Sequence, residues 1–191
     1  MSKPRTHVMK IVLMGDGAVG KTSLRQHYLG EGFESQYHET IGADFALKYS
    51  KIATEEGAGG EERLFKFQIW DIAGQPRYTQ VRSILFDRSD GGLLLFDLSN
   101  RASYENAYNW MSTYVKYAGT GAVCLIGNKS DLRDETDVGL ITSEEGEALA
   151  KKLSEEFDRP VPYLETSAKS GHNVDKAFEI LASVWMELST K

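Results

Sequence analysis

The sequence of 191 residues has little cysteine and proline and no long apolar run. A single cysteine, Cys124, excludes an intrachain disulfide, so we expect a reducing, cytoplasmic compartment. The longest apolar stretch, around residues 93–96, has the length of a strand and not of a membrane span. The N-terminal residues include no apolar segment, and Ser2 stands where N-myristoylation requires glycine. We therefore expect neither a signal peptide nor an N-terminal lipid.

An excess of positive charge is also lacking, because the net charge is −6. A nucleic-acid-binding protein usually concentrates lysine and arginine on one face, so no nucleic-acid partner is expected. Hydrophobic residues make up 41% and charged residues 26% of the chain, as in ordinary globular proteins. No linker or internal repeat interrupts the sequence. We therefore predict one domain over residues 1–191, with room for a sizeable core.

Strand-like apolar runs alternate with amphipathic segments of helical period along the chain. Two β-rich runs around a turn rich in glycine and glutamate predict a hairpin, whereas the short continuous apolar runs predict strands buried on both faces. This alternation predicts an α/β fold, with a mostly parallel six-stranded sheet, one antiparallel edge strand and helices on both faces. Predicted strands cover residues 8–14, 44–52, 64–71, 92–97, 122–127 and 163–166; predicted helices include 20–29, a segment around 107–115, one that starts with a capping box at 142–145, and one over 174–188.

Residues 15–22 match the pattern G-x-x-x-x-G-K-[ST] between a predicted strand and a predicted helix. Small residues let consecutive backbone N–H groups turn towards phosphates, and the start of a helix adds partial positive charge. Lys21 is expected to reach the β- and γ-phosphates, and the Thr22 hydroxyl to bind Mg²⁺. The motif predicts a nucleoside triphosphate, but neither its base nor the reaction. The predicted phosphate-binding residues are Asp16, Gly17, Ala18, Val19, Gly20, Lys21, Thr22 and Ser23.

A second motif, Asn128-Lys129-Ser130-Asp131, follows a predicted strand at the end where open α/β sheets bind ligands. A carboxylate can accept hydrogen bonds from both N1–H and the exocyclic amine of guanine. Adenine does not offer these donors, so Asp131 predicts selection of guanine, because adenine would leave a buried charge unpaired. After the last predicted strand, Ser167, Ala168 and Lys169 are expected to form the other wall of the base pocket.

A third motif, Asp71-Ile72-Ala73-Gly74-Gln75, ends another predicted strand. Asp71 fits the carboxylate that holds Mg²⁺ together with Thr22. Gly74 allows a backbone N–H to approach the γ-phosphate, and Gln75 can orient an attacking water molecule.

These motifs, in this order and together with Thr40, resemble the five guanine-nucleotide motifs of the Ras superfamily. Residues 40–45 and 67–71 are most similar to the Rab branch. The resemblance implies a P-loop NTPase G domain that binds GTP and GDP with Mg²⁺, hydrolyses GTP, and acts as a monomeric switch in Rab-like trafficking or signalling. It also implies an exchange factor, a GTPase-activating protein and effectors that contact the switch segments.

The resemblance further assigns residues outside the three motifs. It implies that Phe33 stacks on the guanine edge and that Tyr37 closes over the phosphates, although spacing alone would also allow ordinary packing. It implies that Thr40 joins the Mg²⁺ ligands, with Thr22 and Asp71, only in the GTP-bound state. The implied catalytic residues are Gln75, Lys21, Thr40 and Gly74.

Several positions depart from the Rab pattern. Ile72 replaces a usual threonine, Pro76 follows the catalytic glutamine where an acidic residue is typical, and residues 57–62 lengthen a turn. Phe45 and Trp70 match two members of the aromatic trio that Rab proteins use for effectors, but Leu85 stands at the third position. The final residues contain no cysteine for prenylation, so no direct membrane anchor is expected; membrane association would need further residues or a partner.

Two other functions compete with an active GTPase switch. Pro76 favours a scaffold locked to GTP, whereas the presence of Gln75, Thr40 and Thr22 favours an enzyme. A P-loop kinase or ATPase is disfavoured by Asp131. Arg77 could act as an arginine finger in cis, although a mobile charged residue is typical at this position. The four histidines show no metal-ligand spacing, so no zinc site is predicted.

Overall fold

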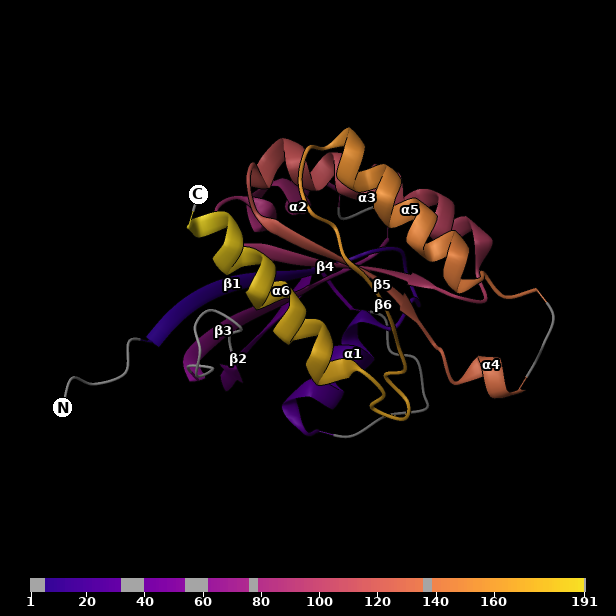
Figure 1. Cartoon of the computed structure of the whole chain (residues 1–191), viewed down its shortest axis with the longest axis horizontal. Helices are drawn as coiled ribbons and strands as arrows, with labels where there is room; N and C mark the ends of the chain where they lie inside the picture. Colours follow the sequence, from indigo (N-terminus) through magenta and orange to yellow (C-terminus); the bar gives the residue numbers. More distant parts are fainter. Residues whose placement is uncertain (1–5, 32–39, 54–61, 76–78, 136–138, 191) are drawn as a thin grey trace.

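The computed structural model describes residues 6–31, 40–53, 62–75, 79–135 and 139–190. Six strands and six helices alternate along these residues (Figure 1). The strands are β1 (Thr6–Met14), β2 (Ala43–Ala53), β3 (Glu62–Ile72), β4 (Gly91–Asp97), β5 (Ala122–Asn128) and β6 (Tyr163–Thr166). The helices are α1 (Lys21–Leu29), α2 (Thr79–Phe86), α3 (Arg101–Ala118), α4 (Leu132–Glu135), α5 (Ser143–Glu156) and α6 (Val174–Ser189).

All six strands form one sheet in the order β2-β3-β1-β4-β5-β6. Only β2 runs antiparallel, and it pairs with β3 from Ala43 opposite Ile72 to Ala53 opposite Glu62. The other neighbouring strands are parallel. The predicted sheet, with its single antiparallel edge strand, is therefore confirmed. Because β1, β3, β4, β5 and β6 run in the same direction, their carboxyl ends meet at one edge of the sheet, where ligands bind in folds of this kind.

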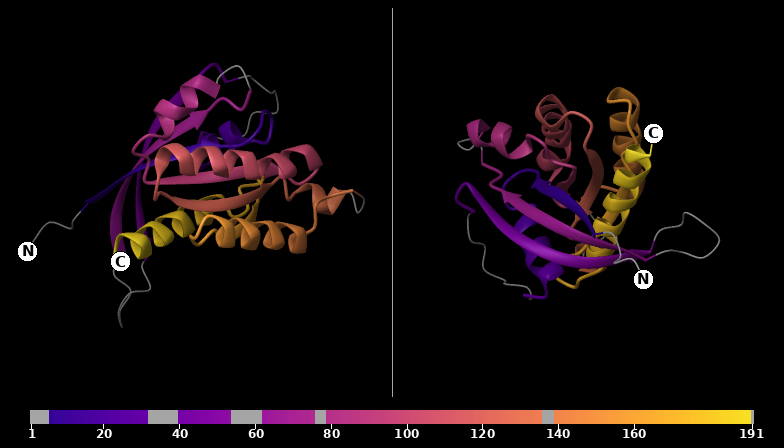
Figure 2. Two further views of the ribbon diagram at one scale, coloured as in Figure 1. Left: turned by 90° about the horizontal axis from the view of Figure 1, so that it is seen from above. Right: turned by 90° about the vertical axis from the view of Figure 1, so that its left-hand side faces the viewer.

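Helices cover both faces of the sheet, α2, α3 and α5 on one face and α1 and α6 on the other (Figures 1 and 2). Successive side chains of a strand point to opposite faces, and β1 shows this alternation. Met9, Ile11 and Leu13 pack in the cluster that includes α1 and α6, whereas Val12 and Met14 pack in the cluster that includes α2, α3 and α5. Continuous apolar strands are thus buried on both sides, as the sequence predicts.

The ends of two helices follow from local side-chain hydrogen bonds. Thr142 caps α5 by accepting from the Glu145 backbone N–H, while the Glu145 side chain accepts from the Thr142 N–H. This reciprocal pair is the predicted capping box. Asn100 caps α3 by accepting from the Ser103 N–H. Two backbone donors at the start of α5 and one at the start of α3 are thereby satisfied.

Some features of the fold differ from the sequence-based prediction. The sequence did not predict α2 or the short α4, and β1 begins at Thr6, two residues earlier than expected. Gly20 was predicted inside a helix, but it precedes α1 with a left-handed φ of 97°. No helix among the described residues is long and apolar enough to cross a membrane.

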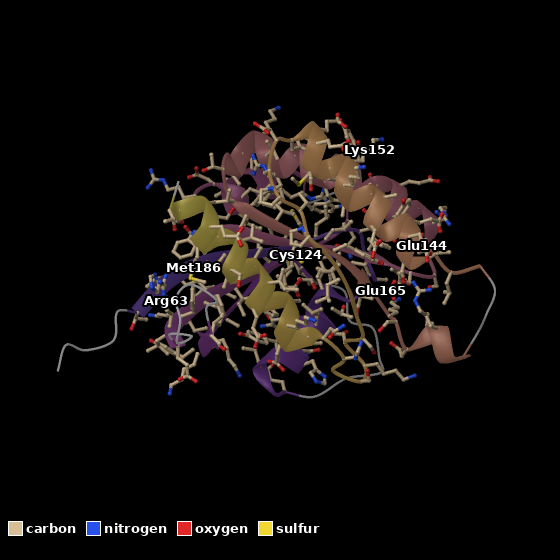
Figure 3. The ribbon with its side chains drawn as sticks, viewed as in Figure 1. Arg63, Cys124, Glu144, Lys152, Glu165 and Met186 are labelled. Atoms are coloured by element: carbon tan, nitrogen blue, oxygen red, sulfur yellow. The ribbon has the colours of Figure 1, made fainter. Side chains whose placement is uncertain are left out.

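Two side-chain positions can be followed in Figure 3. Cys124 lies in the interior on β5 and is fully buried, as expected for a cysteine in an apolar run. Arg63 on β3 lies beside Met186 on α6, with 3.5 Å between the Arg63 Nη1 and the Met186 sulfur. The C-terminal half of α6 therefore contacts the strand that leads towards the Asp71 motif.

Candidate functional site

The loop that joins β1 to α1 has a backbone conformation that residues with a side chain rarely adopt. Gly15 and Gly20 have φ values of 138° and 97°, in the region that favours glycine. A Cβ on Gly15 would lie 2.2 Å from the Leu95 carbonyl oxygen, and a Cβ on Gly20 would lie 2.2 Å from Asn128 Nδ2. Both glycines of the phosphate-binding pattern are therefore required by the loop geometry. Ala18 also adopts a left-handed φ of 63°.

Lys21 spans this loop from the first turn of α1. Its ammonium donates to the carbonyl oxygens of Gly15 at 2.9 Å and Asp16 at 2.7 Å. The side chain is 6% exposed, and this burial lowers the pKa of Lys21 to about 8, although Asp71 and Asp16 partly oppose the shift. An ammonium has three donors, so one remains beyond these two hydrogen bonds for an anionic ligand. Ser23 follows two residues later and lies in the same first turn of α1.

Three predicted Mg²⁺ ligands converge although they lie far apart in sequence. The Thr22 hydroxyl donates to Asp71 Oδ2 at 2.5 Å and lies 3.0 Å from the Thr40 hydroxyl. Asp71 is fully buried, which raises the pKa of its carboxyl, while the Thr22 hydrogen bond and the Lys21 charge oppose this rise. No described residue donates a hydrogen bond to the buried Asp71 Oδ1.

This donor set fits Mg²⁺, which prefers oxygen ligands from hydroxyls and carboxylates and usually keeps further positions for water and phosphate. The unsatisfied Asp71 Oδ1 is what a carboxylate beside an absent cation is expected to show. The described residues contain no cluster of three or more histidine, cysteine, aspartate or glutamate side chains that could hold a metal ion.

An ion pair behind the metal ligands was not anticipated. Arg25 Nη2 lies 2.7 Å from Asp44 Oδ2, and Asp44 is the residue opposite Asp71 across the β2–β3 pair. The Arg25 side chain is 9% exposed, and its charge helps to lower the pKa of Asp71 against the effect of burial. The pair joins α1 to the start of β2, four residues after Thr40.

Asn128, the last residue of β5, connects the phosphate-binding loop to the loop after β6. Its Nδ2 donates to the Val19 carbonyl oxygen at 2.8 Å. Its Oδ1 accepts from the Thr166 hydroxyl at 3.0 Å and from the Ala168 backbone N–H at 3.2 Å. Asn128 is 1% exposed, so these hydrogen bonds fix its side chain completely. The predicted base-binding residue thus positions the other loops.

The other residues of the predicted base pocket lie together. Asp131 Oδ1 accepts from the Ser167 hydroxyl at 2.5 Å, and Lys169 Nζ lies 3.7 Å from Asp131 Oδ2. Lys129 has a left-handed φ of 72°, and its ammonium lies 2.6 Å from Asp97 Oδ2. The structure therefore brings together the two motif segments predicted for base recognition, 128–131 and 167–169, and an ion pair connects the first of them to β4.

Gly74 packs directly on the phosphate-binding loop. A Cβ on Gly74 would lie 2.4 Å from the carbonyl carbon of Asp16 and from the Gly17 nitrogen. The backbone at Gly74 therefore lies directly against the phosphate-binding loop. Gln75, the next residue, is described and partly buried.

Four residues singled out in the sequence, Phe33, Tyr37, Pro76 and Arg77, lie outside the described residues. Among the predicted effector aromatics, the Phe45 and Trp70 rings pack 4.8 Å apart, and Leu85 is partly buried against the core.

Sequence reasoning also missed several residues of the site, namely Arg25, Asp44, Arg82, Asp97, Asn106 and Trp110. Asp97 could have been found, since it is an acidic residue at the carboxyl end of a buried strand. The others lie within helices or β2 and carry no motif spacing.

A phosphate-binding loop and a carboxylate-containing base pocket that share the carboxyl edge of one parallel sheet define a P-loop guanine-nucleotide-binding protein. Comparison with known proteins agrees with this class. The sequence matches the Ras family over residues 10–187, and the chain belongs to that family. It is therefore a small GTPase, a class whose members use GTP, GDP and Mg²⁺.

Curated relatives of the Rab branch align with nearly the whole chain. Ras-related protein Rab-27B of Rattus norvegicus is 35% identical over 189 residues, which cover 97% of this chain and 83% of the relative. Ras-related protein Rab-27A of Homo sapiens is 36% identical over 185 residues, with 95% and 80% covered. Ras-related protein SEC4 of Candida albicans is 38% identical over 181 residues, with 94% and 78% covered. The resemblance to the Rab branch is thus confirmed.

Proposed function

We propose that this chain is a single G domain that binds GTP or GDP with Mg²⁺ in the site described above and hydrolyses the γ-phosphate. The observation that carries the proposal is the convergence of the Thr22, Thr40 and Asp71 side chains, together with the buried Asp71 Oδ1, which lacks a hydrogen-bond donor among the described residues. In the proposed complex with GTP, Thr22, Thr40 and Asp71 would hold the ion, which would supply positive charge to neutralise the phosphates.

The phosphate chain would lie along the loop from Asp16 to Ser23, with the Lys21 ammonium on the β- and γ-phosphates. Burial supports this role, since a desolvated ammonium interacts with an anion more strongly than one in water. Guanine would lie between the loop at Asn128, Lys129 and Asp131 and the loop at Ser167, Ala168 and Lys169. Phe33 and Tyr37 complete the proposed nucleotide-binding set by resemblance.

Hydrolysis in this proposal depends on position and charge and forms no covalent enzyme intermediate. Gln75 orients the attacking water, the backbone N–H of Gly74 binds the γ-phosphate, and Lys21 stabilises the charge that develops in the transition state. Residues 26–39 contain no arginine, so switch I supplies no arginine finger and intrinsic hydrolysis is expected to be slow. Ras, with an intrinsic rate on the order of 10⁻⁴ s⁻¹ and roughly 10⁵-fold stimulation by an arginine in trans, sets the scale.

The Rab-branch relatives support a role as a monomeric switch in intracellular trafficking or signalling. An exchange factor, a GTPase-activating protein and effectors would contact the switch segments. The exposed Phe45, 43% accessible and packed against Trp70, supports an effector surface between these segments.

A single-turnover assay with GTP or ATP tests the proposed activity. We expect slow hydrolysis of GTP that requires Mg²⁺, no hydrolysis of ATP, and loss of stimulated turnover in Gln75→Leu with GDP affinity unchanged. Tight GTP binding without any turnover would instead support a scaffold locked to GTP. Turnover of ATP at the rate of GTP would refute the proposed base recognition.

A further inference from the structure

Arg82 on α2 reaches back to the loop that follows β3. Its Nη2 donates to the carbonyl oxygens of Gly74 and Gln75, at 3.0 Å in each case. Hydrogen bonds from a charged donor are stronger than those between neutral groups. One guanidinium group therefore fixes the backbone of both the residue proposed to contact the γ-phosphate and the residue proposed to orient water.

Trp110 on α3 holds the guanidinium group in place. The Arg82 guanidinium carbon lies 3.8 Å from the centre of the Trp110 ring, well within the range of a cation–π interaction. The ring is 3% exposed, and its Nε1 donates to Asp16 Oδ1 at 2.8 Å. Asn106 Nδ2 donates to the same oxygen at 2.6 Å. The position of Arg82 is thus set by a side chain of the phosphate-binding loop, and we call Asp16, Trp110 and Arg82 the arginine bridge.

The two segments that the arginine bridge connects, the phosphate-binding loop and the loop after β3, also contact each other directly. Gly74 lies so close to the backbone at Asp16 and Gly17 that no side chain fits between them. The Ala73 N–H also donates to the Gly42 carbonyl oxygen, at 2.9 Å. The bridge adds a further, charge-assisted attachment from the side of α2 and α3.

Arg82 is held at a cost in solvation. Burial lowers its pKa, the Asp16 charge partly opposes this, and no described residue accepts a hydrogen bond from its buried Nε. The Arg82 charge also contributes to lowering the pKa of Lys21, so its field extends to the proposed phosphate site. A half-buried arginine with an unused donor has a higher desolvation cost than an exposed arginine. The hydrogen bonds of Arg82 to the loop after β3 offset this cost.

We propose that Arg82 is a positioning residue for GTP hydrolysis. The arginine bridge holds the Gly74 and Gln75 backbone against the phosphate-binding loop, so that less conformational freedom remains to be lost when Gln75 orients the attacking water. This inference rests on the water-orienting role of Gln75 in the proposed function.

Single-turnover hydrolysis, the affinity for GDP and the thermal midpoint test the proposal in the full chain with Mg²⁺. In Arg82→Ala we expect hydrolysis to be about tenfold slower, while the affinity for GDP changes less than about threefold and the midpoint remains close to that of the wild type. Arg82→Lys should recover part of the rate, because an ammonium keeps the charge but not the planar stacking. Arg101→Ala is the matched control, because Arg101 also lies over an aromatic ring, that of Tyr104, and pairs with Glu145 away from Gly74. This variant should hydrolyse GTP at the wild-type rate.

A double-mutant cycle tests whether the bridge acts as one unit. Trp110→Phe removes the hydrogen bond to Asp16, and we expect the double variant to be no slower than Arg82→Ala alone. A wild-type rate in Arg82→Ala, a parallel fall in GDP affinity and rate, or single effects that multiply would each overturn the inference. Gln75→Leu is measured alongside: if it hydrolyses GTP normally, the proposed function itself has failed, whereas a slow Gln75→Leu with a normal Arg82→Ala refutes only the bridge.

Discussion

The carboxylate of Asp131 is 19% exposed and interacts with Ser167 and Lys169 before any base is present. Asp131→Asn replaces an acceptor-only group with one that also donates a hydrogen bond. We expect this variant to prefer xanthine over guanine nucleotides, because the new amide can donate to the C2 carbonyl of xanthine. Competition titration with GDP and XDP measures the change. Asp158→Asn, on the exposed turn after α5, serves as the control, and wild-type GTP affinity in Asp131→Asn would contradict the base-binding role.

Gly20, in the phosphate-binding loop, can be compared with Gly30, which follows the other end of α1. Both have left-handed φ values, 97° and 81°, so alanine is strained at either position. A Cβ on Gly20 would meet Asn128 Nδ2 at 2.2 Å, whereas one on Gly30 has nothing within 4 Å. We expect Gly20→Ala to reduce GDP affinity at least about tenfold by displacing Asn128, and Gly30→Ala to lower stability by about 1 kcal/mol without loss of affinity. Calorimetric titration with GDP measures the affinity of both variants. Equal losses of affinity would show that backbone strain alone is responsible.

The site residues that the sequence predicted are those with fixed spacing inside a motif. Gly15, Lys21 and Asp131 belong to such patterns: Gly15 and Asp131 lie in the loops that follow β1 and β5, and Lys21 begins α1. Arg82 and Trp110 could not be predicted, since their contact joins two helices 28 positions apart through a stacking geometry that no local pattern encodes. The spacing within a motif predicts the residues that contact a ligand, but not the residues on other elements, such as Arg82 and Trp110, that hold the loop in place.

At the scale of elements, α5 is the helix whose start the sequence predicted most fully. Thr142→Ala removes the side-chain acceptor for the Glu145 N–H, and we expect the free energy of unfolding to fall by about 1 kcal/mol. Thr142→Ser keeps the hydroxyl and should unfold like the wild type. Urea denaturation at constant m-value measures both changes. Equal midpoints for the alanine and serine variants would show that the capping box contributes nothing to stability.

Strands β1, β4 and β5 could be predicted because each is a short apolar run, and β2 and β3 because two β-rich runs flank a turn rich in glycine and glutamate. Helix α2 escaped prediction because its exposed face carries Ile84, which is 73% accessible, so its apolar residues do not fall on a single stripe. Helix α4 has only four residues, too few for a period to show. Element ends were displaced by one or two residues where the backbone hydrogen bonds, and not the side chains, set the boundary.

At the scale of the whole molecule, Cys124 reports on global unfolding. It is fully buried on a central strand, and burial raises the pKa of its thiol to about 12. The reactive thiolate is therefore a very small fraction of the native state at pH 8, whereas an unfolded cysteine ionises near pH 8.5. We expect a thiol reagent at pH 8 to label the native GDP-bound protein at least about a thousandfold more slowly than the protein in urea. Rapid labelling under native conditions would show that β5 opens locally.

The three hydrogen bonds of the Asn128 side chain connect the phosphate-binding loop with the loop after β6, and all three are buried. In the proposed complex, the loops that would bind the base and the phosphates are therefore joined by the protein itself, and the distance between them does not depend on the nucleotide. We expect the site to select ligands by the length of the spacer between base and phosphate. A guanine compound with every recognised group intact, but with a shorter or longer spacer between base and phosphate, should therefore be rejected.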